Sequence, residues 1–202
     1  MDFNKTEKLK TLCEKISDCQ NCLLGNTRNQ FVFGEGNPES SILFIGEGPG
    51  KEEDKQGKPF IGRSGKLLTI AIEKVFQKPR ENAAYITNIV KCRPTVDYKM
   101  EKDRPPEPEE VTQCRPILVQ QMEIIKPALI ITLGASSTKT LLEKRIAITK
   151  VRGEILPFME TSLMPVFHPS YVLRNGGQSG KLWTVFLGDI EKAFRFAHDQ
   201  AN

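Results

Sequence analysis

The sequence predicts a single α/β domain over residues 1–202, with a central, mainly parallel β-sheet of about four strands and helices on both faces. Segments 41–47 and 128–134 are short and almost wholly apolar, as parallel strands buried on both faces are. Segments with apolar residues at helical spacing alternate with the expected strands, which favours a covered parallel sheet. The length of 202 residues suits one such domain and is too short for two large ones.

The first half of the chain opens with an expected helix over 4–18, because apolar residues recur there at helical spacing. The first strand, 41–47, runs into a Gly-Pro-Gly turn. A helix with one apolar face is expected from 64 to 76, and the second strand from 85 to 91.

The second half begins with a Pro-rich, charged segment at 93–108, which is expected to be an exposed loop. A helix starts at 106–110 with proline and acids in its first turn, and Pro116 is expected to kink or break it. After the third strand, 128–134, a helix begins near Ser136. The expected final elements are two strands and a closing helix, at 151–158, 163–167 and 180–198.

Four of the five cysteines stand in two distant pairs. Cys19 and Cys22 form a C-x2-C, which places two thiolates on one tight turn, and Cys92 and Cys114 can complete a set of four ligands. Spacing alone does not separate zinc from an iron–sulfur cluster, and scattered reduced cysteines are a third interpretation. Cys13 belongs to the apolar stripe of the first helix and is expected in the core.

Three peptides lie where expected strands end, the place at which open α/β sheets bind ligands. Residues 46–54 carry glycines that let a ligand approach the backbone, although a plain turn also explains them. Asn88 offers donors and an acceptor that can bond the edge of a base or the backbone. His168, which opens 168–175, is one of two histidines and can bind a ligand or serve the structure.

Charge and hydropathy narrow the function classes without choosing one. A net charge of +4 with 29 Lys and Arg permits a nucleic-acid partner but does not require one. No apolar run reaches membrane-spanning length, and the polar N-terminus lacks the apolar core of a signal peptide. A reducing, cytoplasmic location is therefore expected, where cysteines favour metal binding over disulfides. The chain is expected to act as a monomer.

Five motifs follow one another along most of the chain: GEGPG at 46–50, GKPFIGRSG at 57–65, TNIVKCRP at 87–94, PEPEEVTQCRP at 106–116 and HPSYVLR at 168–174. In this combination the sequence resembles the iron–sulfur uracil-DNA glycosylases, family 4 of the uracil-DNA glycosylase superfamily. The resemblance implies an enzyme that flips uracil out of single- or double-stranded DNA and hydrolyses its N-glycosidic bond. The abasic site that remains would be the first product of base excision repair.

The resemblance implies a role for each residue of a uracil pocket. Phe60 would stack on the flipped base, and Asn88 would bond its N3–H and O4 edge. His168 would bond O2 as the departing base gains negative charge. Glu53 would lie near C5 and exclude the methyl group of thymine.

The attacking water would be bordered by Glu47 and by the backbone of Gly48 and Gly50. The best-known members of the superfamily carry an Asp next to the position of Glu47, and Gly48 stands there instead. The group that positions the water therefore stays open. The residues implied to face DNA, with an apolar wedge in the minor groove, are Ser64, Ser170, Tyr171, Val172, Leu173 and Arg174.

The implied cofactor is a structural 4Fe-4S cluster, held by Cys19, Cys22, Cys92 and Cys114 in loop elements at 19–22 and 92–114. The sequence departs from the family between the last two cysteines, where the stretch TVDYKMEKD is expected to form a surface insertion. It also lacks the Arg-Arg-Ile-His segment of relatives that link covalently to uracil DNA.

One rival interpretation is a module of this fold that binds DNA ends or uracil without cutting. The joint presence of Asn88, Phe60 and His168 counts against it, because binding alone does not need a donor for the departing base.

Overall fold

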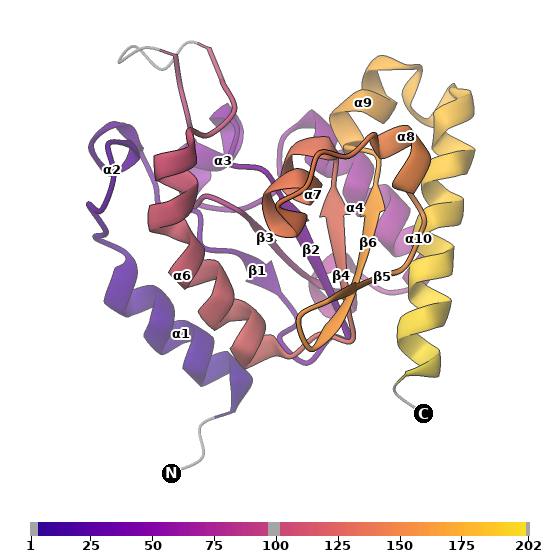
Figure 1. Cartoon of the computed structure of the whole chain (residues 1–202), viewed down its shortest axis with the longest axis horizontal. Helices are drawn as coiled ribbons and strands as arrows, with labels where there is room; N and C mark the ends of the chain where they lie inside the picture. The colour runs from indigo at the N-terminus through magenta and orange to yellow at the C-terminus, as the bar shows by residue number, and fades with distance from the viewer. Residues whose placement is uncertain (1–3, 97–101, 201–202) are drawn as a thin grey trace.

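A six-stranded sheet crosses the molecule between two layers of helices (Figure 1). The computed structural model describes residues 4–96 and 102–200, and within them the strand order is β1-β3-β2-β4-β6-β5. The four inner strands are parallel, and the short outer strands β1 and β5 run antiparallel to their neighbours. The strands are β1 Glu35–Gly36, β2 Ile42–Gly46, β3 Tyr85–Asn88, β4 Leu129–Leu133, β5 Leu156–Phe158 and β6 Thr161–Val166.

This architecture confirms the predicted fold class, with two short edge strands beyond the expected four. The second expected strand, 85–91, ends early at Asn88. There the chain bends, and the Lys91 N–H turns to the sulfur of Cys114 at 3.3 Å. The expectation of a strand over 151–158 is wrong in its first half, where Gly153 makes a turn with φ +71° and donates to the Pro165 carbonyl.

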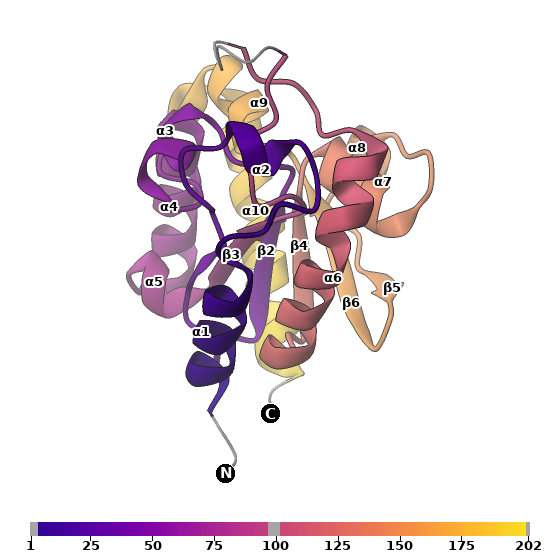
Figure 2. The same cartoon turned by 90° about the vertical axis from the view of Figure 1, so that its left-hand side faces the viewer.

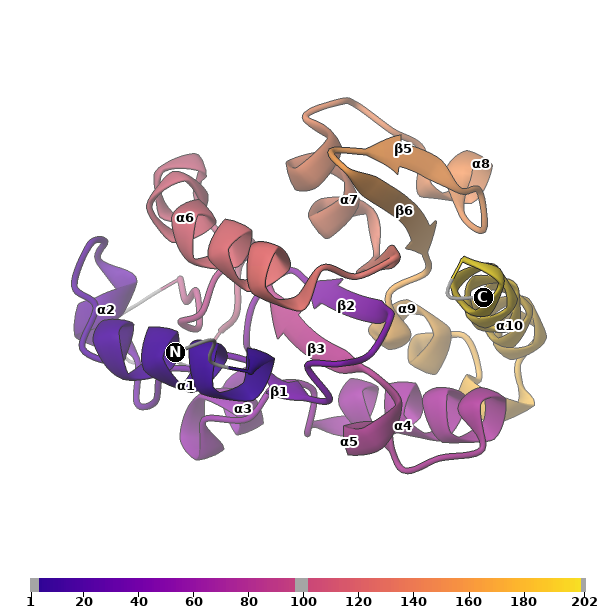
Figure 3. The same cartoon turned by 90° about the horizontal axis from the view of Figure 1, so that it is seen from below.

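One face of the sheet is covered by α4 (Arg63–Phe76) and α10 (Lys181–Asp199), the predicted helices at 64–76 and 180–198. Alternate strand residues such as Ile42 and Phe44 pack on this side with the apolar faces of both helices. Figure 3, seen from below, shows these two helices on the opposite side of the sheet from α1 and α6.

The other face carries α1 (Lys5–Ile16), α6 (Pro108–Ile125) and α7 (Ala135–Leu142). The intervening residues of β2, Leu43 and Ile45, point here and pack with α1 and α6. Cys13 packs against the same cluster, as the apolar stripe of the first helix predicts.

Pro116 does not break its helix, which contradicts the sequence expectation. Helix α6 runs unbroken for 18 residues, and a capping box between Glu107 and Glu110 fixes its start. Pro116 itself is exposed, so water can satisfy the carbonyl that it leaves unbonded, while the next residues, Ile117 and Leu118, are buried.

Short helices that periodicity did not predict occupy the loops: α2 (Leu24–Thr27), α3 (Lys51–Gln56), α5 (Arg80–Ala83), α8 (Ile148–Val151), α9 (Pro169–Arg174) and the 3-10 turn η1 (Gly177–Ser179). Each is too short for an amphipathic pattern to show in sequence. Figure 2 shows α2, α3 and α9 at the end of the molecule away from the two termini. None of the helices in the described ranges is long and apolar enough to cross a membrane.

Candidate active site

A cavity of about 670 Å³ opens at the carboxyl end of the parallel strands. Its walls come from the loop after β2, the end of β3, the segment before α4, the start of α9 and the loop before α6. Open α/β sheets bind ligands at this end because loops from several strands converge there. The volume lies within the range of small-molecule sites.

Asn88 closes the inner end of the cavity with an unpaired acceptor. The side chain is 1% exposed, and its Oδ1 is buried without a hydrogen-bond partner in the described structure. It is paired in register with Gly46, where an added Cβ would come within 2.4 Å of that oxygen. A buried acceptor without a partner is costly, so this atom is suited to an N–H donor of a ligand.

Phe60 lies beside Asn88 with its backbone in the left-handed region, at φ +53°. An added Cβ on Gly46 would lie 2.4 Å from its ring, which shows how closely the ring packs on the end of β2. The ring centroid is 6.4 Å from that of His168. An aromatic surface, an amide and an imidazole thus border one space.

His168 is held as a neutral imidazole that keeps one N–H free for a ligand. It caps α9, and its Nδ1 accepts the Ser170 N–H at 3.1 Å, with the Ser170 hydroxyl at 2.7 Å. Burial, with a smaller effect from Arg174, lowers the pKa of His168 to about 4. Because Nδ1 is an acceptor, the ring proton of the neutral form is on Nε2.

Glu47 is the carboxylate at the end of β2, and Ser136 at the start of α7 donates to its Oε1 at 2.5 Å. The neighbouring Gly48 leaves no room for a side chain, because an added Cβ would come within 2.9 Å of Val90. Packing therefore explains why no Asp occupies position 48.

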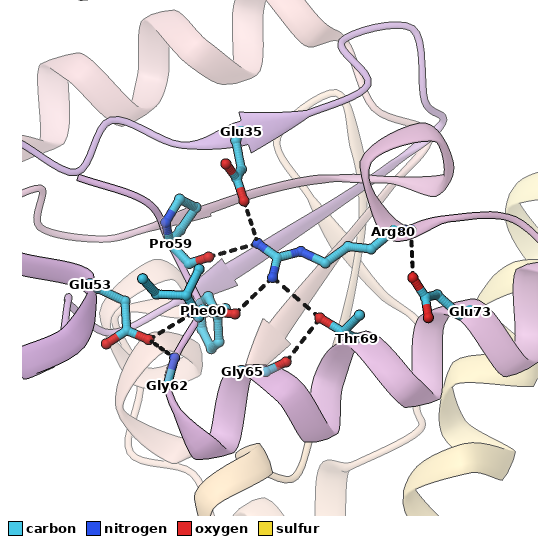
Figure 4. A network of polar contacts seen from close by, with 10 residues as sticks. Glu35, Glu53, Pro59, Phe60, Gly62, Gly65, Thr69, Glu73 and Arg80 are labelled. Atoms are coloured by element: carbon cyan, nitrogen blue, oxygen red, sulfur yellow. Dashed lines mark hydrogen bonds and ion pairs between the residues drawn. The ribbon is translucent and has the colours of Figure 1, made fainter. Parts of the chain in front are cut away.

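Glu53 lines the same cavity from α3 and is 8% exposed. Its Oε1 accepts the backbone N–H groups of Ile61 at 2.9 Å and of Gly62 at 2.8 Å (Figure 4). The carboxylate therefore fixes the segment that follows Phe60, whatever else it contacts.

The loop before α6 forms the opposite wall through Pro94, Asp103, Arg104 and Pro105. This segment was expected to be exposed, but residues 91–95 are buried. Arg93 is 3% exposed and pairs with Asp103 at 2.6 Å. The predicted surface insertion lies mostly at 97–101, outside the described residues.

The four paired cysteines meet at one side of this loop. Arg28 donates to the Cys19 carbonyl at 2.7 Å and to the Cys92 sulfur at 3.3 Å, which ties the N-terminal turn to the end of the second pair. Burial raises the pKa of the Cys92 thiol to about 11, and the charges of Cys114 and Cys22 add to this. Cys19 and Cys22 likewise raise the pKa of Cys114.

Within residues 4–96 and 102–200, no three side chains of His, Cys, Asp or Glu are grouped to hold a metal ion. One zinc ion needs its four ligands within bonding distance of a single point, at about 2.3 Å for sulfur. A 4Fe-4S cluster takes one thiolate on each of four irons and so holds its ligands farther apart. Four cysteines that interact electrostatically without converging on a point fit the second arrangement.

The sequence matches known proteins along almost all of its length. A family model described as uracil DNA glycosylase superfamily matches residues 33–190. A Thermotoga maritima protein named type-4 uracil-DNA glycosylase is 41% identical over 196 residues, covering 96% of this chain and 97% of that protein. The chain belongs to this family. Proteins of the same name from Sulfurisphaera tokodaii and Saccharolobus solfataricus are each 40% identical over 177 residues, covering 84% of this chain and 77% and 79% of theirs.

The structure gathers most of the expected site residues of this type-4 uracil-DNA glycosylase family member around one cavity. The lining includes Glu47, Gly48, Gly50, Glu53, Phe60, Ser64, Asn88, His168, Ser170 and Arg174.

Val172 is the exception among the residues expected to face DNA. It is fully buried in the core, because α9 turns that residue inward, and Leu173 is half-buried against the same core. Tyr171 is 41% exposed. The side chains of α9 available to DNA are therefore those of Ser170, Tyr171 and Arg174, rather than that of Val172.

Sequence reasoning missed several residues of the glycosylase site. Gly46 makes room for Asn88 and Phe60, and Gly134 for His168, whose Cβ would lie 2.8 Å from a Cβ added there. Asp103 and Arg104 stand in a segment with no periodic pattern, so nothing local indicated that they line a cavity. A polar residue just after a strand end, such as Ser136, was the one available signal.

Proposed function

We infer that this protein is a uracil-DNA glycosylase, which hydrolyses the N-glycosidic bond of uracil in DNA and so begins base excision repair. The observation that carries the inference is the convergence of Asn88, Phe60 and His168 on one cavity. Family membership supports the same activity.

The uracil must leave the base stack before it can reach this cavity, because a base inside a duplex is inaccessible. Phe60 offers the face for stacking, which is worth about 1–3 kcal/mol per base. Asn88 reads the edge: its buried Oδ1 accepts from N3–H, and its amide donates to O4. Cytosine presents a donor in place of O4 and lacks the N3–H, so it loses both bonds.

His168 stabilises the leaving base. As the bond between base and sugar breaks, negative charge develops on uracil and positive charge on the sugar. The Nε2–H of a neutral His168 donates to O2, and its position is set in advance by the bond from the Ser170 N–H. A donor placed beforehand, in a site that excludes water, stabilises the developing charge.

Glu47 borders the attacking water in this proposal. Its carboxylate, oriented by Ser136, lies at the end of β2 next to the Gly48–Gly50 backbone. The carboxylate also favours the positive charge that develops on the sugar. Because position 48 has no room for a side chain, Glu47 is the carboxylate we assign to this step.

Glu53 has two duties in this proposal. Its Oε1 fixes the 61–62 backbone, and its other oxygen borders the cavity near Gly50. That second oxygen would meet the methyl group at C5 of thymine, and so exclude normal DNA bases. DNA itself would lie across Ser64, Ser170, Tyr171 and Arg174.

We propose that Cys19, Cys22, Cys92 and Cys114 hold a 4Fe-4S cluster. When bound, such a cluster cross-links the N-terminal segment, the end of β3 and helix α6, so that its binding stabilises the fold. The N–H groups of Arg28 and Lys91 are placed to bond the ligand sulfurs. We also propose a monomer in the reducing cytoplasm, where unpaired thiols persist.

The test is a single-turnover cleavage assay on oligonucleotides that carry uracil in single strands, opposite G and opposite A. We expect release of uracil and an abasic product from at least one substrate, and no release from matched thymine substrates. Binding of uracil DNA without release would instead support the non-cutting module.

A further inference from the structure

Arg80 is a buried cation that the proposed chemistry does not use. It begins α5, is 8% exposed, and does not line the cavity. Its guanidinium donates to the Pro59 carbonyl at 2.6 Å and the Phe60 carbonyl at 2.7 Å, as Figure 4 shows. Further bonds reach Thr69 at 3.3 Å and Glu35 at 3.0 Å.

These contacts fall on a backbone that needs support. Phe60 has φ +53°, a conformation that side-chain-bearing residues rarely adopt without surrounding constraint. Arg80 holds the carbonyls of residues 59 and 60 from one side, and Glu53 holds the N–H groups of 61 and 62 from the other. Helix α4 closes the third side, since a Cβ on Gly65 would lie 2.0 Å from the Phe60 carbonyl oxygen.

We propose that Arg80 is a positioning residue for uracil excision, acting through Phe60. By bonding the carbonyls on both sides of the Phe60 Cα–N linkage, it holds the left-handed turn that aims the aromatic ring at the cavity. This rests on the proposed stacking of uracil on Phe60. Arg80 touches neither base nor DNA, so its effect must pass through the ring.

The planar guanidinium suits this duty better than an ammonium would. Nη1 serves the Phe60 carbonyl and Thr69, while Nη2 serves the Pro59 carbonyl and Glu35, so one rigid fork fixes two adjacent carbonyls. Lysine keeps the charge but has no such fork.

The experiment is a double-mutant cycle between Arg80→Lys and Phe60→Leu, read by single-turnover uracil release at saturating enzyme and by inhibition with free uracil. We expect Arg80→Lys to lower the rate about tenfold, because small misplacements of contact groups cost this much or more. Inhibition by free uracil should weaken to a similar degree, while affinity for uracil-free DNA stays within about twofold. In the Phe60→Leu background the same change should cost less than about twofold.

Thr69→Val is the matched control, since it removes one Arg80 contact and neither carbonyl contact, and its rate should stay near that of the wild type. Arg80→Gln is a second variant, whose neutral amide retains two N–H donors. Equal losses in both Phe60 backgrounds, or loss of folding in both Arg80 variants, would overturn the proposal and leave the glycosylase assignment intact. A wild-type protein that releases no uracil would overturn both.

Discussion

At the scale of single residues, burial decides what each polar group can do. The acceptor of Asn88 is buried and unpaired, which makes it selective for a donor. The imidazole of His168 is buried beside a cation, which keeps it neutral. Both conditions come from the cavity walls rather than from the side chains themselves.

Replacing His168 with Ala should slow uracil release by about 10²–10³, the usual loss for one oxyanion donor. DNA binding should change little, because the side chain acts on the departing base. Single-turnover rates and DNA affinity measured together check this. A variant that retains nearly the full rate would remove His168 from the reaction.

The depressed pKa of His168 also makes stability depend on pH. Between its ordinary pKa of 6.5 and the folded value of about 4, the unfolded chain binds more protons than the folded one. Stability should therefore fall as the pH drops through this window, by up to about 3 kcal/mol. Denaturant unfolding at pH 7 and pH 4 should show this loss in the wild type and less of it in His168→Gln.

Asn88→Asp exchanges the amide donor for an acceptor. Uracil recognition should weaken by about 1–3 kcal/mol, the worth of a good bidentate base contact. A trace of cytosine release is the accompanying expectation, because a carboxylate can accept from the exocyclic amine. Rates on paired uracil and cytosine oligonucleotides measure both, and unchanged uracil release would refute the assignment.

At the scale of elements, the site depends on how loops are tied to helices. Helix α6 begins where the loop that carries Arg104 ends, and Glu110 joins the two. Its carboxylate accepts from Arg104 at 2.6 and 2.8 Å and from the Glu107 N–H at 2.7 Å. One side chain thus caps the helix and holds the cavity wall.

Glu110→Ala should destabilise the protein by about 1–3 kcal/mol, because it removes a helix cap and leaves Arg104 unpaired. Burial raises the pKa of Glu110, but the bonds from Arg104 and Glu107 outweigh it and hold the pKa below 4.5. The contribution should therefore be present above pH 4.5 and fade as the pH falls through the lowered value. Urea unfolding measures it, with exposed Glu109→Ala as the control, and equal effects from both would contradict it.

At the scale of the whole molecule, the four cysteines join segments that lie far apart in the chain. Cys19 and Cys22 follow α1, Cys92 follows β3, and Cys114 lies within α6. A cluster bound there would stabilise contacts among three elements at once, so its binding free energy would add to folding free energy.

Serine at any of these four positions should therefore lower iron content and melting temperature together. Cys13→Ser should keep the full iron content, because Cys13 packs in the core beside Glu14 and is not among the charges that act on Cys92 or Cys114. Iron analysis and thermal unfolding of the five single variants check this. Full iron in Cys114→Ser, or its loss in Cys13→Ser, would show that the ligand set is wrong.

The sequence by itself determined the parallel strands, the long helices and the order of the motifs. These depend on local patterns: apolar runs for buried strands, helical spacing for α4 and α10, and glycines beside strand ends. It also brought Glu47, Asn88 and His168 into view, because the ends of parallel strands meet at one edge of a sheet.

Only the tertiary structure decided how those residues are held. Arg80 lies 20 residues from the Phe60 carbonyl that it bonds, and Arg104 reaches the cavity through a loop without periodicity. Pro116 stays helical, and Val172 turns into the core, because packing against other elements outweighs the local preference of each. The sequence names the reacting groups, whereas contacts between distant segments set their positions and charge states.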